Sequence, residues 1–158
     1  MTGNKILAYQ AYNLSQDNKG VKVLVGGCFD IFHIGHLRFL IAAKKKGDWL
    51  IIALESDDFI RVKKKRNPFH TQQERAEILS YLDCVDSVVM LPYFTDDNDY
   101  MKMVNKIKPE IIAVTENDKL LSKKISQAKQ IGGRLEIVTS FINNKSSIDL
   151  LKAIKKLD

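Results

Sequence analysis

The chain has 158 residues, of which 45% are hydrophobic and 28% charged, and its formal net charge is +6. This length and balance are typical of one globular domain with its own core, and they exclude a disordered or fibrous chain. No apolar run is long enough to span a bilayer, and the N-terminus lacks the apolar region of a signal peptide, so we expect a cytoplasmic protein.

The positive charge and the cysteines point to no special class of protein. The two cysteines, Cys28 and Cys84, are far apart and have neither metal-binding nor redox spacing, so we expect both to be reduced. Much of the excess charge lies in lysine runs at residues 44–46 and 63–66, which are typical of solvated surfaces. A polyphosphate ligand needs only a few of these cations, so nucleic acid is not the favoured partner.

In chain order, the pattern begins with a loosely apolar segment and continues as alternating strands and helices. Apolar residues between positions 5 and 16 predict a short helix, so residues 1–20 are interpreted as an N-terminal helical extension. Short apolar runs predict strands at residues 21–25, 49–54, 85–91, 111–114 and 135–138. Helical segments separate these runs. Residues 1–158 are therefore predicted to form a single α/β domain, a Rossmann-like doubly wound sheet of about five parallel strands.

The turn after the strand at residues 21–25 carries the strongest functional signal. Gly26 and Gly27 end that strand, and His33 and His36 bracket Gly35 where the next helix starts. The glycines allow close approach of a ligand, and the helix directs unpaired N–H groups and its positive dipole end toward it. Because the two histidines are three positions apart, their imidazoles can converge on one anionic ligand such as a chain of phosphates. Two histidines without a third ligand leave a zinc site incomplete.

The same residues carry a resemblance to a known family. The sequence GCFD at residues 27–30, followed by HIGH at residues 33–36, resembles the signature of the cytidylyltransferase-like nucleotidyltransferases. The wider layout is most similar to the nucleotidyltransferase domain of ADP-heptose synthase. It is also similar to glycerol-3-phosphate and phosphoethanolamine cytidylyltransferases.

The resemblance implies transfer of an AMP or CMP moiety from ATP or CTP to a phosphorylated sugar or polyol, with release of pyrophosphate. The favoured hypothesis is an adenylyltransferase acting on a sugar phosphate. The alternatives are a cytidylyltransferase acting on glycerol 3-phosphate or another phospho-alcohol, and a non-catalytic nucleotide- or RNA-binding module. The resemblance also implies Mg²⁺ that bridges phosphate oxygens, with no metal site made by protein ligands alone. Relatives are commonly dimers, which makes a homodimer a candidate assembly.

By the same resemblance, His33 and His36 donate hydrogen bonds to the phosphates as negative charge builds in the transition state. Lys63, with Lys65 as second choice, would hold the triphosphate from the cationic loop at residues 63–66 as a flexible point charge. The nucleotide-binding residues that the resemblance implies are Gly26, Gly27, Cys28, Phe29, Asp30, Gly35, Arg75, Asp118, Ser146 and Ser147.

Several of these assignments leave a structural alternative open. Asp30 either braces the turn or binds metal. Arg75 follows a capping box at residues 71–74 and takes either a phosphate-side or a structural role. Ser146 either caps the last helix or contacts phosphate. Residues 115–118 depart from the glycine-rich segment of the family, and only Asp118 matches it.

Overall fold

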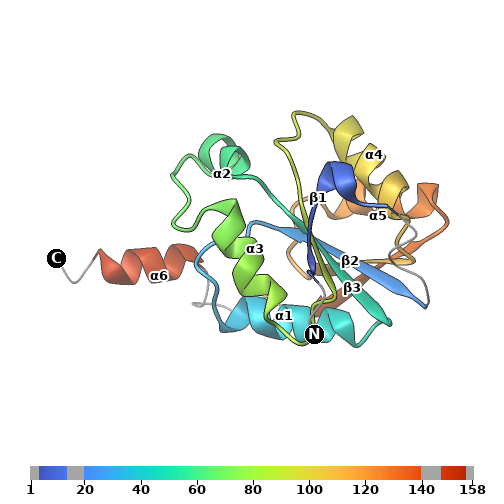
Figure 1. Ribbon diagram of the computed structural model, residues 1–158, viewed down its shortest axis with the longest axis horizontal. Helices are drawn as coiled ribbons and strands as arrows, with labels where there is room; N and C mark the ends of the chain where they lie inside the picture. The colour runs from blue at the N-terminus through green and yellow to red at the C-terminus, as the bar shows by residue number, and fades with distance from the viewer. Residues whose placement is uncertain (1–3, 14–19, 140–146, 156–158) are drawn as a thin grey trace.

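The computed structural model describes residues 4–13, 20–139 and 147–155, which form a single parallel sheet flanked by helices (Figure 1). The sheet has six strands in the order β1-β4-β3-β2-β5-β6. The strands are β1 (Ile6–Ala8), β2 (Lys22–Gly27), β3 (Trp49–Leu54), β4 (Ser87–Met90), β5 (Ile111–Thr115) and β6 (Arg134–Thr139). The helices are α1 (Ile34–Lys44), α2 (Asp57–Lys63), α3 (Gln72–Ser80), α4 (Asp97–Ile107), α5 (Leu121–Gln130) and α6 (Ser147–Ile154).

The central strands are apolar on both faces because helices cover both. On one face, Val25 of β2 belongs to a core cluster with Leu40 of α1 and other residues of α1 and α3. On the other, Leu24 belongs to a second cluster with Val104 of α4 and residues of α5. Successive strand residues point to opposite faces, so a strand between two helical layers needs a continuous apolar run. The doubly wound α/β class predicted from such runs is confirmed.

The N-terminal segment differs from its prediction. The helix expected over residues 5–16 is wrong for residues 5–13, because Ile6–Ala8 forms β1 and a 3₁₀ turn, Tyr9–Ala11, follows it, while residues 14–16 lie outside the described part of the chain. β1 pairs in parallel with β4, with Ile6 opposite Val88, and so raises the strand count from about five to six. Ile6 packs against one core cluster and Leu7 against the other, as alternating strand residues do. Three residues are too few to reveal that alternation in the sequence.

The strand order places the HIGH motif at the point where the order of strand addition reverses, here called the sheet reversal. From β2 the chain runs outward through β3 to β4, and it then returns to add β5 and β6 on the other side of β2. β2 pairs with both β3 and β5, so the carboxyl ends of β2 and β5 lie next to each other. In doubly wound sheets ligands bind outside the carboxyl ends of the strands at this reversal. The motif loop begins there, directly after Gly27.

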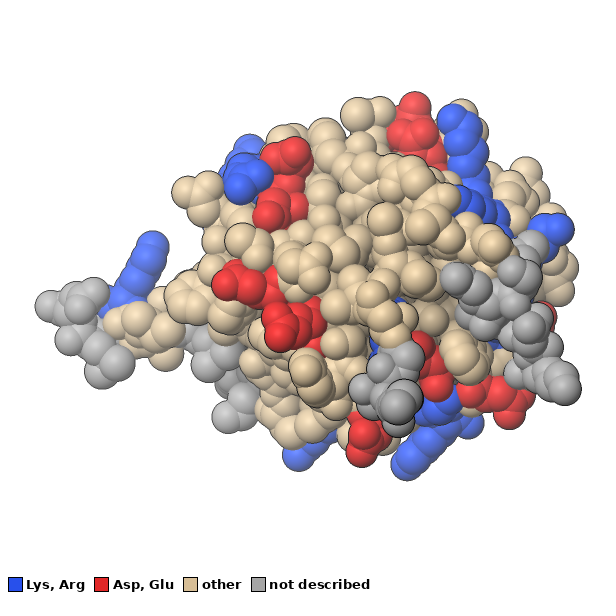
Figure 2. Space-filling model, in the orientation of Figure 1, with Lys and Arg blue, Asp and Glu red and all other residues tan. Residues whose placement is uncertain are grey.

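Lysine and arginine side chains do not gather into one patch on the face that Figure 2 shows, where they lie apart and often beside acidic groups. Several are paired, including Lys44 with Asp86 at 2.7 Å and Lys123 with Asp97 at 2.7 Å. Over the parts of the chain described above, no helix has both the length and the apolar character needed to cross a bilayer.

Candidate active site

The loop between β2 and α1 has a constrained backbone. Phe29 (φ 49°) and Ile31 (φ 53°) are both in the left-handed region, which non-glycine residues rarely adopt and which is strained for a β-branched side chain. Phe29 is 5% exposed and packs in the core. A Cβ atom at Gly27 would lie 2.9 Å from the Phe29 ring, whereas one at Gly26 would meet nothing closer than 4.0 Å. Gly27 thus makes room for Phe29, and Gly26 leaves the strand end open.

Asp30 ties this loop to the segment that follows α2. Its carboxylate is 2% exposed and accepts hydrogen bonds from the Arg66 guanidinium and from the backbone N–H groups of Phe69 and His70. Burial alone would raise the pKa of Asp30, but the hydrogen bonds from His70, Arg66 and Phe69 outweigh it and hold the pKa below its usual value. These contacts match the bracing role, the first of the two roles considered for Asp30.

The two histidines of the motif converge. His33 is the N-cap of α1, and its Nδ1 accepts a hydrogen bond from the Gly35 N–H at 3.0 Å. The His33 and His36 rings are stacked, with centroids 3.8 Å apart and an interplanar angle of 26°. Because Nδ1 of His33 is an acceptor, its neutral ring carries the proton on Nε2, which is thereby a donor. The geometry predicted from the three-residue spacing is present.

The surroundings of these rings favour their neutral forms. The pKa of His36 is lowered to about 4, mainly by burial and also by the His33 charge, while the Asp30 charge opposes the change. Burial also lowers the pKa of His33. His36 Nδ1 is buried and has no hydrogen-bond partner within the described part of the chain. Near neutral pH the pair is therefore uncharged, and His36 retains a polar atom for a ligand.

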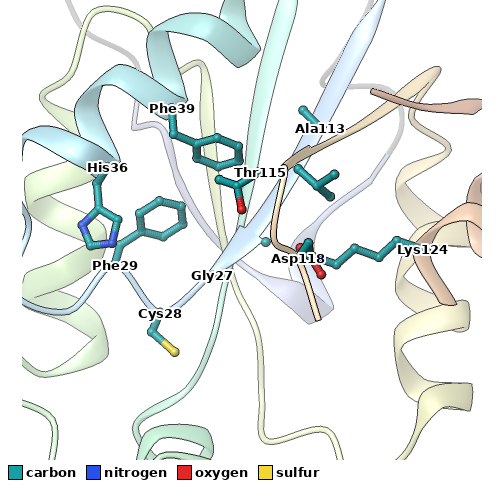
Figure 3. A pocket seen from close by; sticks show the side chains of 11 residues that line it. Gly27, Cys28, Phe29, His36, Phe39, Ala113, Thr115, Asp118 and Lys124 are labelled. Carbon is teal, nitrogen blue, oxygen red and sulfur yellow. The ribbon is translucent and has the colours of Figure 1, made fainter. Parts of the chain in front are cut away.

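A cavity of about 180 Å³ opens at the sheet reversal, beside His36. Figure 3 shows His36 next to Phe29, with the Lys124 side chain reaching toward Asp118 on the other side. Glycine and apolar residues make up most of the cavity wall, as in many small-molecule sites. The cavity is lined by Gly26, Gly27, Cys28, Phe29, His36, Phe39, Ala113, Val114, Thr115, Asp118 and Lys124.

Asp118 and Lys124 form an ion pair at the cavity wall, with 2.6 Å between Nζ and Oδ2. The other carboxylate oxygen of Asp118 accepts from the Leu120 N–H at 2.8 Å, close to the start of α5. Although residues 115–118 depart from the family pattern, the structure places Asp118 at the cavity. Lys124 was not anticipated, because the sequence alone does not show which of the neighbouring lysines on α5 faces inward.

Arg75 is fully buried and its hydrogen bonds lie inside the protein. Its Nη1 donates to the carbonyl oxygens of Cys28 at 2.6 Å and Glu55 at 2.9 Å, and its Nη2 pairs with Asp57 at 2.7 Å. Its Nε donates to the His70 carbonyl at 3.2 Å. These contacts support the structural alternative rather than a phosphate contact, because the side chain is 0% exposed.

The cationic loop after α2 does not line the cavity, and the assignment of its lysines to a triphosphate stays a prediction. Lys63 is the exposed last residue of α2 and does not line the cavity. Burial raises the pKa of the Cys28 thiol to about 11, and the strongest opposing charge is that of the next lysine, Lys64. Lys64 also lowers the pKa of Glu55. Lys64 is likewise exposed and outside the cavity lining, and its charge acts on Cys28 and Glu55.

The two serines expected at the start of the last helix fall at the edge of the described part of the chain. Ser146 lies outside the described residues. Ser147 is the first residue of α6, and only its backbone is described. Their assignment to a phosphate contact stays a prediction.

Glu55 and Tyr100 form a hydrogen-bonded pair to which the sequence assigned no role, and neither of them lines the cavity. Glu55 follows β3 and is 7% exposed, and its Oε1 accepts a hydrogen bond from the Tyr100 hydroxyl at 2.8 Å. Its Oε2 is buried and has no partner among the residues that the structure describes. Burial raises the pKa of Glu55 to about 7, against the Tyr100 hydrogen bond and the charges of Lys124, Arg75 and Lys64. A carboxylate directly after an apolar strand, at the ligand-binding edge, was the available signal.

The raised pKa of Glu55 has a measurable effect on stability. Between pH 4.5 and about 7 the folded state keeps a proton that the unfolded chain releases, so this group makes the free energy of unfolding fall as pH rises. Glu55→Gln lacks this ionisable group. Its free energy of unfolding, relative to that of wild type, should therefore rise by about 3 kcal/mol between pH 4.5 and about 7. Urea denaturation at a series of pH values measures the difference. Glu116→Gln, at an exposed position, should follow wild type. Parallel profiles for wild type and Glu55→Gln would contradict the assignment.

Within residues 4–13, 20–139 and 147–155, no group of three or more His, Cys, Asp or Glu side chains is arranged to hold a metal ion. The Asp30 carboxylate, the acidic group of the motif, is engaged by Arg66 and backbone N–H groups. A divalent cation at this site would need other ligands, such as phosphate oxygens.

Comparison with known proteins agrees with this geometry. Residues 24–149 match the family described as cytidylyltransferase-like. The chain is 32% identical over 137 residues to the bifunctional protein HldE of Geotalea uraniireducens, covering 84% of this chain and 26% of that protein. It is 30% identical over 142 residues to the FAD synthase of Pyrococcus abyssi, covering 89% of this chain and 94% of that one. The chain thus spans about a quarter of the HldE relative and nearly all of the FAD synthase.

A solved structure has the same fold. The lipopolysaccharide core biosynthesis protein from Thermoplasma volcanium superposes with a TM-score of 0.64 at 28% identity, covering 78% of this chain and 98% of that one. The family match covers most of the chain and includes the whole histidine motif at the sheet reversal. This chain belongs to the cytidylyltransferase-like family of nucleotidyltransferases.

Proposed function

We propose that the protein transfers the AMP moiety of ATP to a phosphorylated small-molecule acceptor, with a sugar phosphate as the favoured acceptor, and releases pyrophosphate. The observation that carries this proposal is the stacked pair of imidazoles, His33 and His36, at the N-terminus of α1. The pair adjoins a cavity at the sheet reversal, where nucleotides bind in doubly wound sheets.

In this reaction a phosphate oxygen of the acceptor attacks the α-phosphorus of the triphosphate. A bond from that oxygen to the α-phosphorus forms, and the bond from the α-phosphorus to the bridging oxygen breaks, so that pyrophosphate leaves with the electron pair. The acceptor phosphate is already an anion near neutral pH, so no protein nucleophile is needed. Positioning and preorganised hydrogen-bond donors lower the barrier. The Nε2–H of His33, an N–H of His36 and the free amides of α1 supply such donors.

Mg²⁺ would enter bound to the triphosphate oxygens, since the described part of the chain offers no cluster of protein ligands and Asp30 is engaged in hydrogen bonds. This fits the preference of Mg²⁺ for substrate phosphates with few protein ligands. When bound, the ion neutralises charge on the phosphates. The chain itself contributes neutral histidine donors and the cations of the loop after α2.

The family resemblance implies Lys63 as the triphosphate lysine, and the charge of its neighbour Lys64 on Cys28 and Glu55 supports Lys64 as a second candidate, which we propose as the stronger contact. Lys64→Ala should raise the KM for the triphosphate by about tenfold, the scale for losing one hydrogen bond to a charged group. Lys63→Ala, the matched control on the same loop, should change KM less. Steady-state pyrophosphate release at varied triphosphate concentration measures both. The reverse order of effects would return the role to Lys63.

ATP is favoured because two kinds of relative, HldE and FAD synthase, support an adenylyl donor. A thermal-shift comparison of ATP with CTP, each with Mg²⁺, tests the donor because a ligand that binds the folded state raises its apparent stability. Pyrophosphate release is then measured with sugar phosphates, glycerol 3-phosphate and riboflavin 5′-phosphate as acceptors. Turnover with ATP and a sugar phosphate supports the proposal. A larger shift and turnover with CTP would make it a cytidylyltransferase, and binding without turnover on any acceptor would make it a nucleotide-binding module.

A further inference from the structure

Glu55 occupies a fixed position beside the motif loop. Its N–H donates to the Gly27 carbonyl at 3.0 Å, which continues the pairing of β3 with β2 by one residue. The buried Arg75 guanidinium joins the Cys28 and Glu55 carbonyl oxygens. The backbone of Glu55 is thus held at the carboxyl edge of the sheet, on the side of β2 opposite to β5.

The side chain of Glu55 is held at one oxygen and free at the other. Tyr100 of α4 donates to Oε1, whereas Oε2 is buried and lacks a partner among the described residues. A buried polar atom without a hydrogen bond costs about 1–3 kcal/mol. Such an atom needs an explanation, and a hydrogen bond from a bound ligand is one that removes the cost. Here it lies at the edge of the sheet where ligands bind.

The charges around Glu55 limit what that ligand can be. Lys64 after α2, Lys124 of α5 and Arg75 of α3 all act on its carboxyl group. Lys124 pairs with Asp118, and Arg75 pairs with Asp57. The electrostatic potential around the Glu55 carboxyl group is therefore positive or neutral. An ammonium group would face these cations, whereas a phosphate is attracted to them and a neutral hydroxyl is indifferent. The chemistry that fits is a phosphomonoester with a hydroxyl group that can donate to Oε2.

The nucleotide and the acceptor can occupy different sides of β2. The cavity lies between the ends of β2 and β5, where Ala113 and Val114 give it an apolar wall suited to a nucleoside and Thr115 adds a hydroxyl group. Glu55 and Tyr100 lie beyond β2, on the β3 and α4 side. The stacked histidines follow β2 and so lie where both substrates would meet.

We propose that Glu55 is a specificity-determining residue of the acceptor site, whose free Oε2 accepts a hydrogen bond from a hydroxyl group of a polyhydroxylated phosphomonoester. The assignment rests on the proposed nucleotidyl transfer, because it takes the second substrate to be a phosphorylated acceptor. Tyr100 is a positioning residue that orients the carboxyl group.

Equilibrium binding tests this assignment without turnover. Dissociation constants are measured by calorimetry for three six-carbon phosphomonoesters, namely sorbitol 6-phosphate, n-hexyl phosphate and 6-aminohexyl phosphate. The full chain is first saturated with Mg²⁺ and α,β-methylene-ATP, which cannot release pyrophosphate. At pH 8, above the Glu55 pKa of about 7, the carboxyl group is ionised, and wild type should bind sorbitol 6-phosphate about 10- to 100-fold more tightly than n-hexyl phosphate, the range for one hydrogen bond to a charged group.

In Glu55→Met that preference should fall by about tenfold or more, and in Glu55→Gln, which keeps an acceptor oxygen, by less. Glu116→Met, an exposed residue just after β5, is the matched control and should keep the wild-type ratio. The assignment is overturned if Glu55→Met keeps the wild-type preference, if 6-aminohexyl phosphate binds best, or if none of the three binds wild type. Failure of the proposed reaction would appear separately, as absent pyrophosphate release with ATP while the binding preference persists.

Discussion

Replacing His36 with alanine should lower kcat by about 10²- to 10³-fold, the scale for removing one preorganised donor to a developing anion. The His36 ring stacks on His33 at 3.8 Å and lines the cavity, so its removal leaves the transferred phosphate without that donor. Alanine is a good helix former, and the position is in the first turn of α1, so the fold should survive. Pyrophosphate release at saturating substrates, together with a far-UV spectrum, measures both outcomes.

Arg38→Ala is the matched control, because Arg38 is an exposed residue on the same helix, two positions later. It should keep nearly the wild-type kcat. Near-wild-type turnover in His36→Ala would remove this imidazole from the mechanism. Equal losses in both variants would point to an effect on α1 as a whole.

Arg75→Met should lower the free energy of unfolding by about 3–5 kcal/mol, the cost of breaking a buried ion pair by removing one partner. Arg75 is 0% exposed and donates to three carbonyl oxygens as well as to Asp57. These bonds connect the ends of β2 and β3 to the start of α3, so their loss leaves several buried acceptors unsatisfied. Urea denaturation at constant pH measures the change as a shift in midpoint.

Arg61→Met provides the comparison, since Arg61 is exposed and pairs with Asp58 on the surface of α2. That change should stay within about 0.5 kcal/mol of wild type. Asp57→Asn removes only the charge opposite Arg75 and should fall between the two. A loss below about 1 kcal/mol in Arg75→Met would show that its hydrogen bonds contribute little net stability.

The sheet was largely predictable because its interior strands are buried on both faces. A segment such as Trp49–Leu54 has to be apolar at every position, and the sequence records this directly. The edge strand Ile6–Ala8 is too short to show such an apolar run in the sequence. It has only three residues, and its pairing with β4 depends on a segment about eighty residues away. Its assignment as a helix failed because local spacing carries no information about that partner.

The site was predictable where chemistry depends on short spacing. His33 and His36 converge because a helix start places residues three apart on one side, which the sequence states. Arg75 and Glu55 behave otherwise, because their roles depend on which neighbours fold around them. The sequence shows that Arg75 lies in a first helical turn and that Glu55 follows a strand. Burial and hydrogen-bond partners decide that Arg75 holds the loop in place and that Glu55 has a free carboxylate oxygen. The choice between Lys63 and Lys64 likewise depends on how the loop leaves α2.

The most direct test of the histidine-centred site follows the α-phosphate. ATP labelled at the α-phosphate is incubated with Mg²⁺, the protein and each acceptor. The products are then separated and identified by mass spectrometry. The label should appear on the acceptor through a new phosphoanhydride bond, with an equal amount of pyrophosphate, and both should fall together in His33→Ala and His36→Ala. Label released only as free AMP, or an acceptor that gains the γ-phosphate instead, would contradict nucleotidyl transfer at this pair of imidazoles.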